Sequence, residues 1–547
     1  MAQRIHGWLE RHAREQPNQL AVEFLDESLT YAQLDARANQ LAHALLANGA
    51  KSGDRIGLFM DKSIYTPVAI YGVMKAGCAY VPLDPAYGAE RLGSLIDRAQ
   101  IDIVISARAK RRTLATLATM GRAPRALFGV DQPALSERCV SWTAVAEQPA
   151  TSPDISIEPD ALAYIIFTSG STGTPKGIMH THASGLAFAR WAAEEYALTP
   201  ADRLSNHAPL HFDLSIFDFF AGVVAGATTV IVPEDYARLP ASYAQLIHEA
   251  GVSVLFTVPF ALIQLVLRGA IERFSFDQVR WVIFGGEPFP PAHLCALMAR
   301  WPHAAFDNMY GPAEVNGVTH HTVSPEHDAN DAVPIGRVAR GAHGVIVDEQ
   351  GSEVPAGDVG ELLIASPTMM RGYWRAPELD AQVFDDRRSQ QGAVTRYYRT
   401  GDLVRADADG CLHFIGRADR QVKVRGYRVE LDEIELAVTG YPAVEESAAY
   451  VIQDAEGGAT VQVEVTLQRD TVGAREALLN DITRYVKTRL AWYAVPARID
   501  ITKQFPRTTS GKIDRRTLAE TAAARQHQQQ HPDSAAPRSS ETPEPPP

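Results

Sequence analysis

The sequence has few cysteines, and none of them stands in a pattern that carries function. The four cysteines, Cys78, Cys139, Cys295 and Cys411, form neither a Cys-x-x-Cys pair nor a metal-ligand cluster. The sequence therefore predicts no metal site built on cysteine, and a reducing cytoplasm fits this usage best.

Long apolar runs, a leader-like N-terminus and an excess of positive charge are also missing. No stretch of about 18 apolar residues offers a membrane span, and the first residues lack the apolar core of a signal peptide. Acidic side chains outnumber basic ones by 65 to 52, which gives a formal net charge of −13. Neither nucleic acid nor an anionic membrane is therefore expected as the main partner, although a local basic patch could still bind an acidic protein.

The chain is long enough to build more than one core. Its 547 residues, 46% of them hydrophobic, predict roughly two to four domains. Residues 5–48 have the pattern of two amphipathic helices around a short strand pair, and from residue 54 apolar strands alternate with helices. This alternation predicts an α/β fold with parallel-type sheets covered by helices, followed after residue 334 by a smaller β-rich unit. Residues 419–521 have a compact α+β pattern, and the Gln- and Pro-rich residues 522–547 are expected to be disordered.

A hydroxyl- and glycine-rich loop follows one of these strands. Residues 168–177 read Thr-Ser-Gly-Ser-Thr-Gly-Thr-Pro-Lys-Gly, directly after an apolar strand-like run at 163–167. Glycines let the backbone approach an anion closely, while amides, hydroxyls and a lysine supply donors. The spacing differs from that of the nucleotide P-loop because no Gly-Lys-Ser/Thr closes it. The loop therefore predicts a phosphate site of another kind.

This loop resembles the ATP-phosphate loop of adenylate-forming enzymes, the superfamily of acyl- and aryl-CoA ligases and luciferases. The resemblance is greatest to the amino-acid adenylation enzymes of nonribosomal peptide synthesis, including stand-alone enzymes of the L-prolyl-carrier-protein ligase type. Five motifs occur in the family's order between about residues 164 and 515, and the resemblance extends to about residue 521. It implies a large N-terminal core over residues 1–418 that holds the ATP and amino-acid sites, and a small mobile C-terminal domain over 419–521.

The second motif lies at residues 308–314, Asn-Met-Tyr-Gly-Pro-Ala-Glu. It resembles the family's Tyr-Gly-Pro-Thr-Glu, in which the ring stacks near adenine and the carboxylate holds the Mg²⁺ that bridges ATP phosphates. An aromatic face and a carboxylate suit these two tasks. Glu314 is thus the expected magnesium ligand. Ala313 replaces the usual threonine, so one hydroxyl near the α-phosphate must come from elsewhere, such as Thr168 or a water.

The remaining motifs resemble the ribose site, the hinge and the C-terminal lysine loop. Asp402 would bind both ribose hydroxyls, because a carboxylate accepts two donors. In residues 416–430 the resemblance places the hinge at Asp419, a catalytic role at Lys423 and the pantetheine-facing turn at Gly426. Lys512, in a Ser-Gly-Lys loop, would neutralise charge on the carboxylate and α-phosphate during adenylation.

Together, the motifs imply one set of ATP-binding positions and three catalytic residues. The catalytic set is Glu314, Lys423 and Lys512. The ATP-binding set is Thr168, Ser169, Gly170, Ser171, Thr172, Gly173, Lys176, Gly286, Asn308, Tyr310, Gly311, Asp402 and Arg417.

Asp213 distinguishes an amino acid from a simple carboxylic acid as the substrate. Family members that activate α-amino acids carry an aspartate here, which pairs with the substrate ammonium, whereas aryl- and fatty-acyl ligases do not. A buried carboxylate needs a cationic partner, which such a substrate supplies. The alternative is a helix-capping role, for which Phe-Asp-Leu-Ser is also suitable.

The pocket positions are neutral and mostly apolar. Carried over by motif, they are Leu214, Phe217, Thr257, Ile283, Gly285, Met309, Gly317 and Val318. A charged substrate side chain would find no partner there, so acidic and basic amino acids are disfavoured. The set ranks proline first, and alanine, 2-aminobutyrate, threonine and valine stay open.

The resemblance implies two half-reactions at one site. Mg·ATP and an amino acid give aminoacyl-AMP and pyrophosphate, and a phosphopantetheine thiol then takes the acyl group. Fewer than 40 residues follow the Lys512 loop, too few for a carrier domain, so the carrier protein is expected to be separate. The alternatives are an acyl-CoA ligase of the same superfamily and a non-catalytic nucleotide-binding module.

Overall fold

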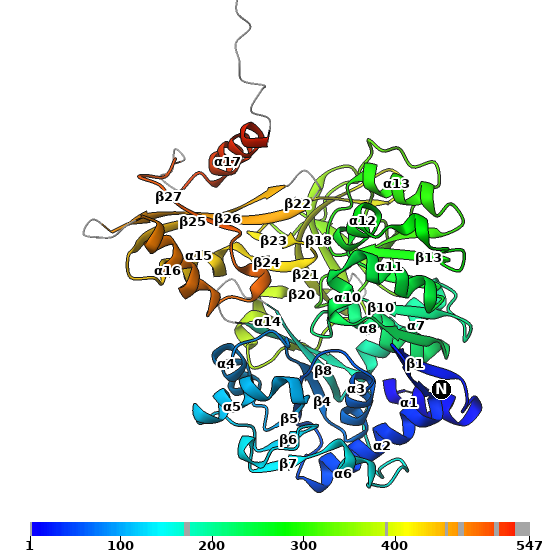
Figure 1. The fold of residues 1–547 in the computed structure, drawn as a ribbon. Coiled ribbons are helices and arrows are strands. Elements are labelled where there is room, and N and C mark those ends of the chain that lie inside the picture. Colours follow the sequence, from blue (N-terminus) through cyan, green and yellow to red (C-terminus); the bar gives the residue numbers. More distant parts are fainter. Residues whose placement is uncertain are drawn as a thin grey trace, which may run out of the picture. The chain divides into compact units, whose positions relative to one another are not determined.

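The structure is a computed structural model that describes residues 3–168, 175–388, 392–453, 458–468, 475–507 and 513–530, with side chains as far as residue 525. The chain divides into two compact units, one ending at Arg428 and the other beginning at Val429 (Figure 1). The predicted hinge, Asp419, lies on the first unit's side of this division. A contact boundary does not locate a hinge, so that assignment stays a prediction.

The first unit contains a nine-stranded sheet in the order β16-β15-β14-β13-β12-β10-β11-β1-β2. Its strands are β1 Leu20–Phe24, β2 Glu27–Thr30, β10 Arg203–Asn206, β11 Thr228–Ile231, β12 Val254–Thr257, β13 Trp281–Gly285, β14 Ala305–Tyr310, β15 Thr319–Thr322 and β16 Arg337–Val338. The central pairs are parallel, and antiparallel strands lie at both edges. The carboxyl ends of β12, β13 and β14 therefore meet at one edge, where open α/β sheets bind ligands.

A second, eight-stranded sheet runs β19-β9-β8-β4-β3-β5-β6-β7. Its strands are β3 Arg55–Phe59, β4 Ala79–Pro82, β5 Ile103–Ser106, β6 Ala126–Phe128, β7 Arg138–Val140, β8 Leu162–Thr168, β9 Lys176–Thr181 and β19 Gly372–Tyr373. β3 to β8 pair in parallel, whereas β8 and β9 form an antiparallel hairpin. The predicted phosphate loop is the connection of this hairpin, and residues 169–174 lie outside the described residues.

Helices of the first unit accompany these sheets, as the alternating pattern predicted. They are α1 Ile5–Glu15, α2 Tyr31–Ala47, α3 Tyr65–Lys75, α4 Ala89–Ala99, α5 Arg111–Thr119, α6 Trp142–Ala146, α7 His182–Glu195, α8 Leu214–Ile216, α9 Gly222–Ala225, α10 Glu234–Arg238, α11 Pro240–Glu249, α12 Pro259–Arg268, α13 Pro291–Arg300 and α14 Pro377–Val383. Local chemistry fixes their starts: Thr30 and Gln33 form a reciprocal capping box on α2, and Thr181 with Ser184 does the same on α7. Proline at the first position begins α11 to α14, where its missing amide costs nothing.

The predicted β-rich unit is a third sheet, and a small hairpin follows it. The sheet consists of β17 His343–Val347, β18 Val359–Ala365, β20 Phe384–Arg388, β21 Val394–Ala406 and β22 Leu412–Arg417, and the hairpin of β23 Gln421–Val424 and β24 Tyr427–Glu430. The second compact unit has α15 Leu431–Thr439, β25 Val444–Gln453, β26 Ala459–Leu467, α16 Arg475–Lys487, β27 Arg498–Ile501 and α17 Arg515–Gln530. The predicted fold class is thereby confirmed.

The C-terminal prediction was wrong for residues 522–530. These residues continue α17 to Gln530, and Ala522 is buried with Leu518 against β25. Alanine, glutamine and arginine are good helix formers, so this stretch can extend a helix that already packs at its start. Residues 531–547 lie outside the described residues.

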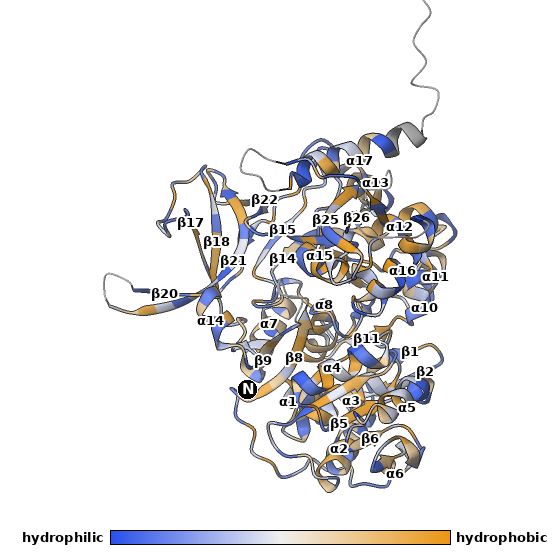
Figure 2. Ribbon diagram, turned by 90° about the vertical axis from the view of Figure 1, so that its left-hand side faces the viewer, coloured by the Kyte–Doolittle hydropathy of each residue, from blue (hydrophilic) through white to orange (hydrophobic). Residues whose placement is uncertain are grey.

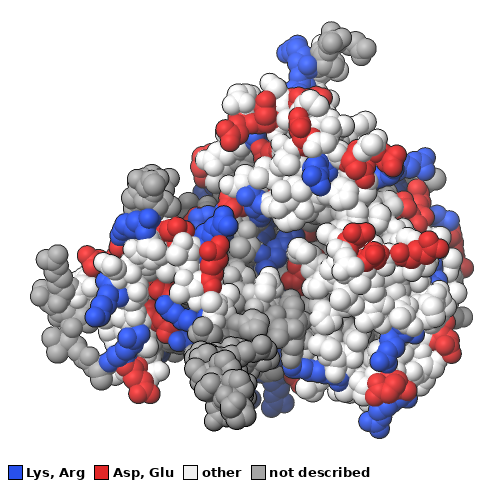
Figure 3. Space-filling view, turned by 90° about the horizontal axis from the view of Figure 1, so that it is seen from above, with Lys and Arg blue, Asp and Glu red and all other residues white. Residues whose placement is uncertain are grey.

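Apolar residues line the strands of the two large sheets, as the orange ribbon of β8 illustrates (Figure 2). On the face drawn in Figure 3, basic and acidic side chains are interspersed. Among the helices described, none combines the length and apolar character that crossing a bilayer requires.

His180 and His182 are buried in the first unit, His207 is half-buried there, and all three have lowered pKa values. Burial lowers the pKa of His180 to about 4 and those of His182 and His207 to about 3. Both ring nitrogens of His180 form hydrogen bonds. Nδ1 lies 3.2 Å from the Ser184 hydroxyl, and Nε2 lies 2.9 Å from the Ala313 carbonyl oxygen. Both ring nitrogens of His182 are buried without a hydrogen bond among the described residues. These rings are therefore held neutral by the fold.

We expect acid to destabilise the first unit through these histidines. Their pKa is about 6.5 in an unfolded chain, so between pH 6.5 and about 4 only the unfolded state takes up their protons. Each ring should remove about 1.4 kcal/mol of unfolding free energy per pH unit in this range, with full stability restored above pH 6.5. Urea unfolding at several pH values measures this. His182→Leu keeps the volume and should give a shallower dependence, and an unchanged slope in that variant would contradict the assignment.

Candidate active site

The phosphate-loop hairpin brings two predicted ATP-binding residues opposite each other. Thr168 ends β8, Lys176 begins β9, and the two are paired across the hairpin. The Thr168 hydroxyl oxygen is buried and has no hydrogen-bond partner among the described residues. A buried unpaired hydroxyl needs a partner, so it is available to a ligand. Ser169, Gly170, Ser171, Thr172 and Gly173 lie outside the described residues.

Glu314 is fully buried at the centre of a charged cluster. It follows β14 through a turn that requires Gly311, where a Cβ would lie 1.5 Å from the Asn316 carbonyl oxygen. The Lys176 ammonium lies 3.8 Å from Glu314 Oε1. Burial raises the pKa of the Glu314 carboxyl, but Arg428 and Lys176 outweigh it and hold the pKa well below its usual range. Glu314 is therefore ionised, as a metal ligand must be.

Sequence reasoning missed two partners of Glu314. Arg428 donates to Oε2 at 2.7 Å, and the Tyr373 hydroxyl donates to Oε1 at 2.8 Å. Arg428 lies within the motif at 416–430, yet nothing in the sequence distinguishes it from its basic neighbours. Tyr373 comes from β19, which pairs with β9, and its position depends on that long-range pairing.

The predicted ribose site is a connected hydrogen-bond network. The Tyr310 hydroxyl donates to Asp402 Oδ2, and Arg417 donates to Asp402 Oδ1. Arg417 also donates to both carboxylate oxygens of Asp419, at 2.6 and 2.7 Å. Gly401 has a φ of +71°, and a Cβ there would lie 2.7 Å from the Arg417 guanidinium. The structure thus brings four predicted residues together from β14, β21, β22 and the turn that follows β22.

Half of the predicted side-chain pocket lies where three parallel strands end. Thr257 pairs with Phe284 and Gly285 pairs with Met309, so the ends of β12, β13 and β14 are aligned. The Phe217 ring packs 5.0 Å from Phe256. Phe217, Ile283 and Met309 are buried in one apolar cluster, with Leu214 packed against it.

Two glycines of the predicted pocket, Gly285 and Gly317, let Met309 pack directly against the backbone. Val318 and Asn308, two other predicted site residues, contact different parts of the first unit. A Cβ at Gly317 would lie 2.6 Å from the Met309 sulfur, and one at Gly285 would lie 2.2 Å from the Met309 carbonyl oxygen. Gly286 has a φ of +93°. Val318 packs instead with Tyr310 in a separate cluster. The Asn308 amide donates to the Pro334 carbonyl at 2.8 Å.

Asp213 is half-buried at the start of α8 and makes no capping hydrogen bond. The structure therefore does not support the alternative in which Asp213 serves as a helix cap. Burial raises the pKa of the Asp213 carboxyl, Lys423 and Arg428 lower it, and Glu314 raises it. Burial lowers the pKa of Lys423, while Asp402 and Asp213 raise it, so this ammonium interacts with both carboxylates.

Lys62 supports the segment that leads to Asp213, and the sequence analysis did not identify it. Its ammonium donates to the carbonyl oxygens of Asn206, His207 and Ala208 at 2.8, 3.0 and 3.4 Å. Burial lowers the pKa of Lys62 to about 8. A lysine just beyond β3 has no periodic signal, so the contact could only be found in three dimensions.

The turn between β23 and β24 is held against α12 and the segment after β13. The Gly426 amide donates to Glu287 Oε2 at 2.8 Å, and Glu287 Oε1 accepts from the Phe260 amide at 3.0 Å. Gly426 has a φ of +82°, and a Cβ there would lie 2.5 Å from Val258. Only glycine fits this turn without displacement. Lys512 lies outside the described residues.

Comparisons with known proteins find relatives that match most of the chain in sequence. Residues 9–374 match the family model of the AMP-binding enzyme, and residues 433–512 match that of the AMP-binding enzyme C-terminal domain. An L-proline--[L-prolyl-carrier protein] ligase of Pseudomonas fluorescens is 34% identical over 506 residues, 92% of this chain and 96% of that protein. A linear gramicidin synthase polypeptide of Brevibacillus parabrevis is 35% identical over 518 residues, and the chain spans only 6% of its length.

The fold also matches solved structures. The amide bond synthetase McbA of Marinactinospora thermotolerans aligns with a TM-score of 0.82 at 26% identity, covering 94% of this chain and 99% of that one.

Proposed function

The chain belongs to the AMP-binding enzyme family and is an AMP-forming ligase, and from this premise we propose that it activates a neutral amino acid for a carrier protein. The carboxylate and Mg·ATP would give aminoacyl-AMP and pyrophosphate, after which a phosphopantetheine thiol takes the aminoacyl group. The observation that carries the proposal is the Asp213 carboxylate, which is half-buried and free of any capping bond.

The residues present fit Mg·ATP. Glu314 is ionised beside Lys176, and the buried Thr168 hydroxyl is unpaired among the described residues. Glu314 would hold Mg²⁺, which would offset charge on the phosphates when bound. Asp402, positioned by Tyr310 and Arg417, would accept the ribose hydroxyls. The Thr168 hydroxyl would compensate for the one that Ala313 lacks.

The pocket favours a substrate side chain without polar groups. Thr257 supplies the only hydroxyl among the predicted pocket side chains, and it lies 2.9 Å from His207 Nδ1. His207 is neutral because burial lowers its pKa to about 3, so Nδ1 can accept the threonine proton. The Thr257 hydroxyl could then only accept from a substrate hydroxyl, so a threonine side chain would gain at most one hydrogen bond there. We keep proline first, with alanine, 2-aminobutyrate, threonine and valine behind it.

The acyl acceptor is proposed to be a separate carrier protein. The support is the relative whose name states a prolyl-carrier substrate and which matches this chain along 96% of its own length. Lys423 and Gly426 would serve the thioester half-reaction, and Lys512 the adenylation half-reaction. Rotation about Asp419 would exchange them.

Amino-acid-dependent exchange of labelled pyrophosphate into ATP tests the first half of the proposal. The panel comprises proline, alanine, 2-aminobutyrate, threonine and valine, together with benzoate and fatty acids. Exchange with proline above the other amino acids is expected. Exchange only with carboxylic acids, followed by coenzyme A thioester formation, would identify an acyl-CoA ligase instead, and no exchange at all would leave a non-catalytic nucleotide-binding module.

Gly426→Ala should impair transfer but spare adenylation. The added Cβ would meet Val258 at 2.5 Å, so the turn must move, and a displacement of about 1 Å can cost roughly 10²-fold in a positioned reaction. Transfer from preformed aminoacyl-AMP to a phosphopantetheinylated carrier measures it. Gly410→Ala is the matched control, because Gly410 has a φ of +76° but no atom within 4 Å of its Cβ position. Equal effects of both substitutions would assign the loss to backbone strain alone.

A further inference from the structure

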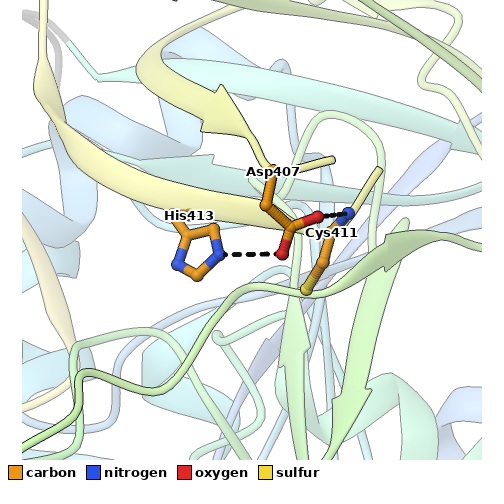
Figure 4. A group of neighbouring side chains, drawn as sticks. All are labelled: Asp407, Cys411 and His413. Atoms are coloured by element: carbon orange, nitrogen blue, oxygen red, sulfur yellow. Dashed lines mark hydrogen bonds and ion pairs between the residues drawn. The ribbon is translucent and has the colours of Figure 1, made fainter. Parts of the chain in front are cut away.

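A cluster of three different metal-ligand side chains lies outside the site described above. Asp407, Cys411 and His413 place a carboxylate oxygen, a thiol sulfur and an imidazole nitrogen within 4.8 Å of one another (Figure 4). All three residues are half-buried. Cys411 was expected to belong to no metal-ligand cluster, but the hairpin places it beside a carboxylate and an imidazole, which no Cys-x-x-Cys spacing reveals.

The hairpin between β21 and β22 positions these side chains on one face. Cys411 and His413 are two residues apart at the start of a strand, so their side chains project to the same side. Asp407 lies opposite Cys411, and its amide donates to the Cys411 carbonyl at 2.9 Å. The turn closes through Gly410, whose φ is +76°. Three potential ligands thus occupy neighbouring positions of one tight hairpin.

Backbone amides hold one oxygen of the Asp407 carboxylate, and the other oxygen faces His413. Its Oδ1 accepts from the amides of Asp409 and Cys411 at 3.0 and 2.8 Å. Its Oδ2 lies 3.3 Å from His413 Nε2. Two ligands about 2.0–2.1 Å from a tetrahedral ion lie roughly 3.3 Å apart, so this pair already has the required separation. The Cys411 sulfur lies within 4.8 Å of both of these ligand atoms and would move closer to them to complete the set.

We propose that Asp407, Cys411 and His413 bind a divalent transition-metal ion, with zinc as the fitting class. Thiolate and imidazole suit zinc, whereas magnesium and calcium take oxygen ligands, so this site differs in chemistry from Glu314. The fourth position is filled by water or by His321 of β15. The proposal does not depend on the adenylation function.

The neighbours of the three side chains include a further imidazole and a cation. His413 interacts electrostatically with His321 of β15. Arg405, which pairs with His413 across the hairpin, is exposed.

Cobalt(II) titration of the full chain, stripped beforehand with a chelator, tests the site. We expect one equivalent to produce a thiolate-to-cobalt charge-transfer band and visible bands of tetrahedral intensity, both abolished by zinc. Cys411→Ser should remove the charge-transfer band, and His413→Gln should weaken zinc binding by about tenfold or more. Asp407→Asn keeps an acceptor for the turn amides and should weaken binding with an unchanged melting temperature. Zinc should raise the melting temperature of the native protein only.

Two controls separate this site from other ligands in the chain. Cys139→Ser should leave the charge-transfer band unchanged. His527→Gln with His531→Gln should also leave it unchanged, because these two histidines, four apart in the sequence, could bind cobalt without sulfur. Retention of the band in Cys411→Ser, or absence of any such band in the native protein, would overturn the proposal. Loss of the four-coordinate spectrum in His321→Gln would assign the fourth ligand, and its retention would assign water.

Discussion

Replacing Asp213 by asparagine is expected to lower proline-dependent pyrophosphate exchange by roughly 10²-fold in kcat/KM. Removing one side of a buried charge pair costs about 3–5 kcal/mol, and the half-buried position of Asp213 places it at the lower end. ATP affinity, measured separately by calorimetry, should change little. Asparagine is nearly isosteric, so the loss reports charge rather than packing.

The control is Asp235→Asn, which changes an aspartate of α10 outside the predicted site and should leave exchange unaltered. A substrate analogue without the ammonium gives an independent check. The native enzyme should discriminate strongly against the analogue, and Asp213→Asn should have lost most of that discrimination. Near-normal activity of Asp213→Asn with proline would mean that the ammonium binds elsewhere.

Replacing Lys512 by alanine should affect the two half-reactions unequally. Loss of one group that stabilises developing charge typically costs about 10²–10³-fold, so adenylation should fall by this amount. Thioester formation from preformed aminoacyl-AMP should stay close to the native rate, because the lysine is proposed to act in one conformation only. Pyrophosphate exchange measures the first step, and loading of a phosphopantetheinylated carrier measures the second.

Lys503→Ala is the matched control, since Lys503 is an exposed lysine of the same compact unit. It should leave both half-reactions intact. Equal losses of both steps in Lys512→Ala would instead indicate a shared role or an unfolded C-terminal unit, and the melting temperature distinguishes these two outcomes.

The parts of the fold that depend on local pattern were predictable. Apolar strands alternating with helices predict parallel sheets, because the chain must cross over between such strands. Partner choice was not predictable: Val22 pairs with Thr229, far away in the sequence, and no local signal specifies this. The extension of α17 was missed because its composition also resembles that of disordered segments.

Site residues that belong to a sequence motif were predictable. Site residues that come together only in the folded chain were not. Tyr310 and Asp402 were assigned separately from two motifs, and the structure joins them through a hydrogen bond. Lys62 and Tyr373 belong to no motif that was identified. Their contacts with the Asp213 segment and Glu314 arise only when two large sheets have formed, and the same holds for the pairing of Arg428 with Glu314.

The Arg428–Glu314 ion pair has an energetic consequence for the order of events at the site. The guanidinium and a magnesium ion would compete for the same carboxylate, so their occupancies are linked. The two effects are reciprocal. If Arg428 lowers the affinity of Glu314 for the metal by some factor, bound metal lowers the affinity of the β23–β24 hairpin for Glu314 by the same factor. If Glu314 holds magnesium as proposed, a higher concentration of free magnesium would therefore weaken the hold of Arg428 on this carboxylate.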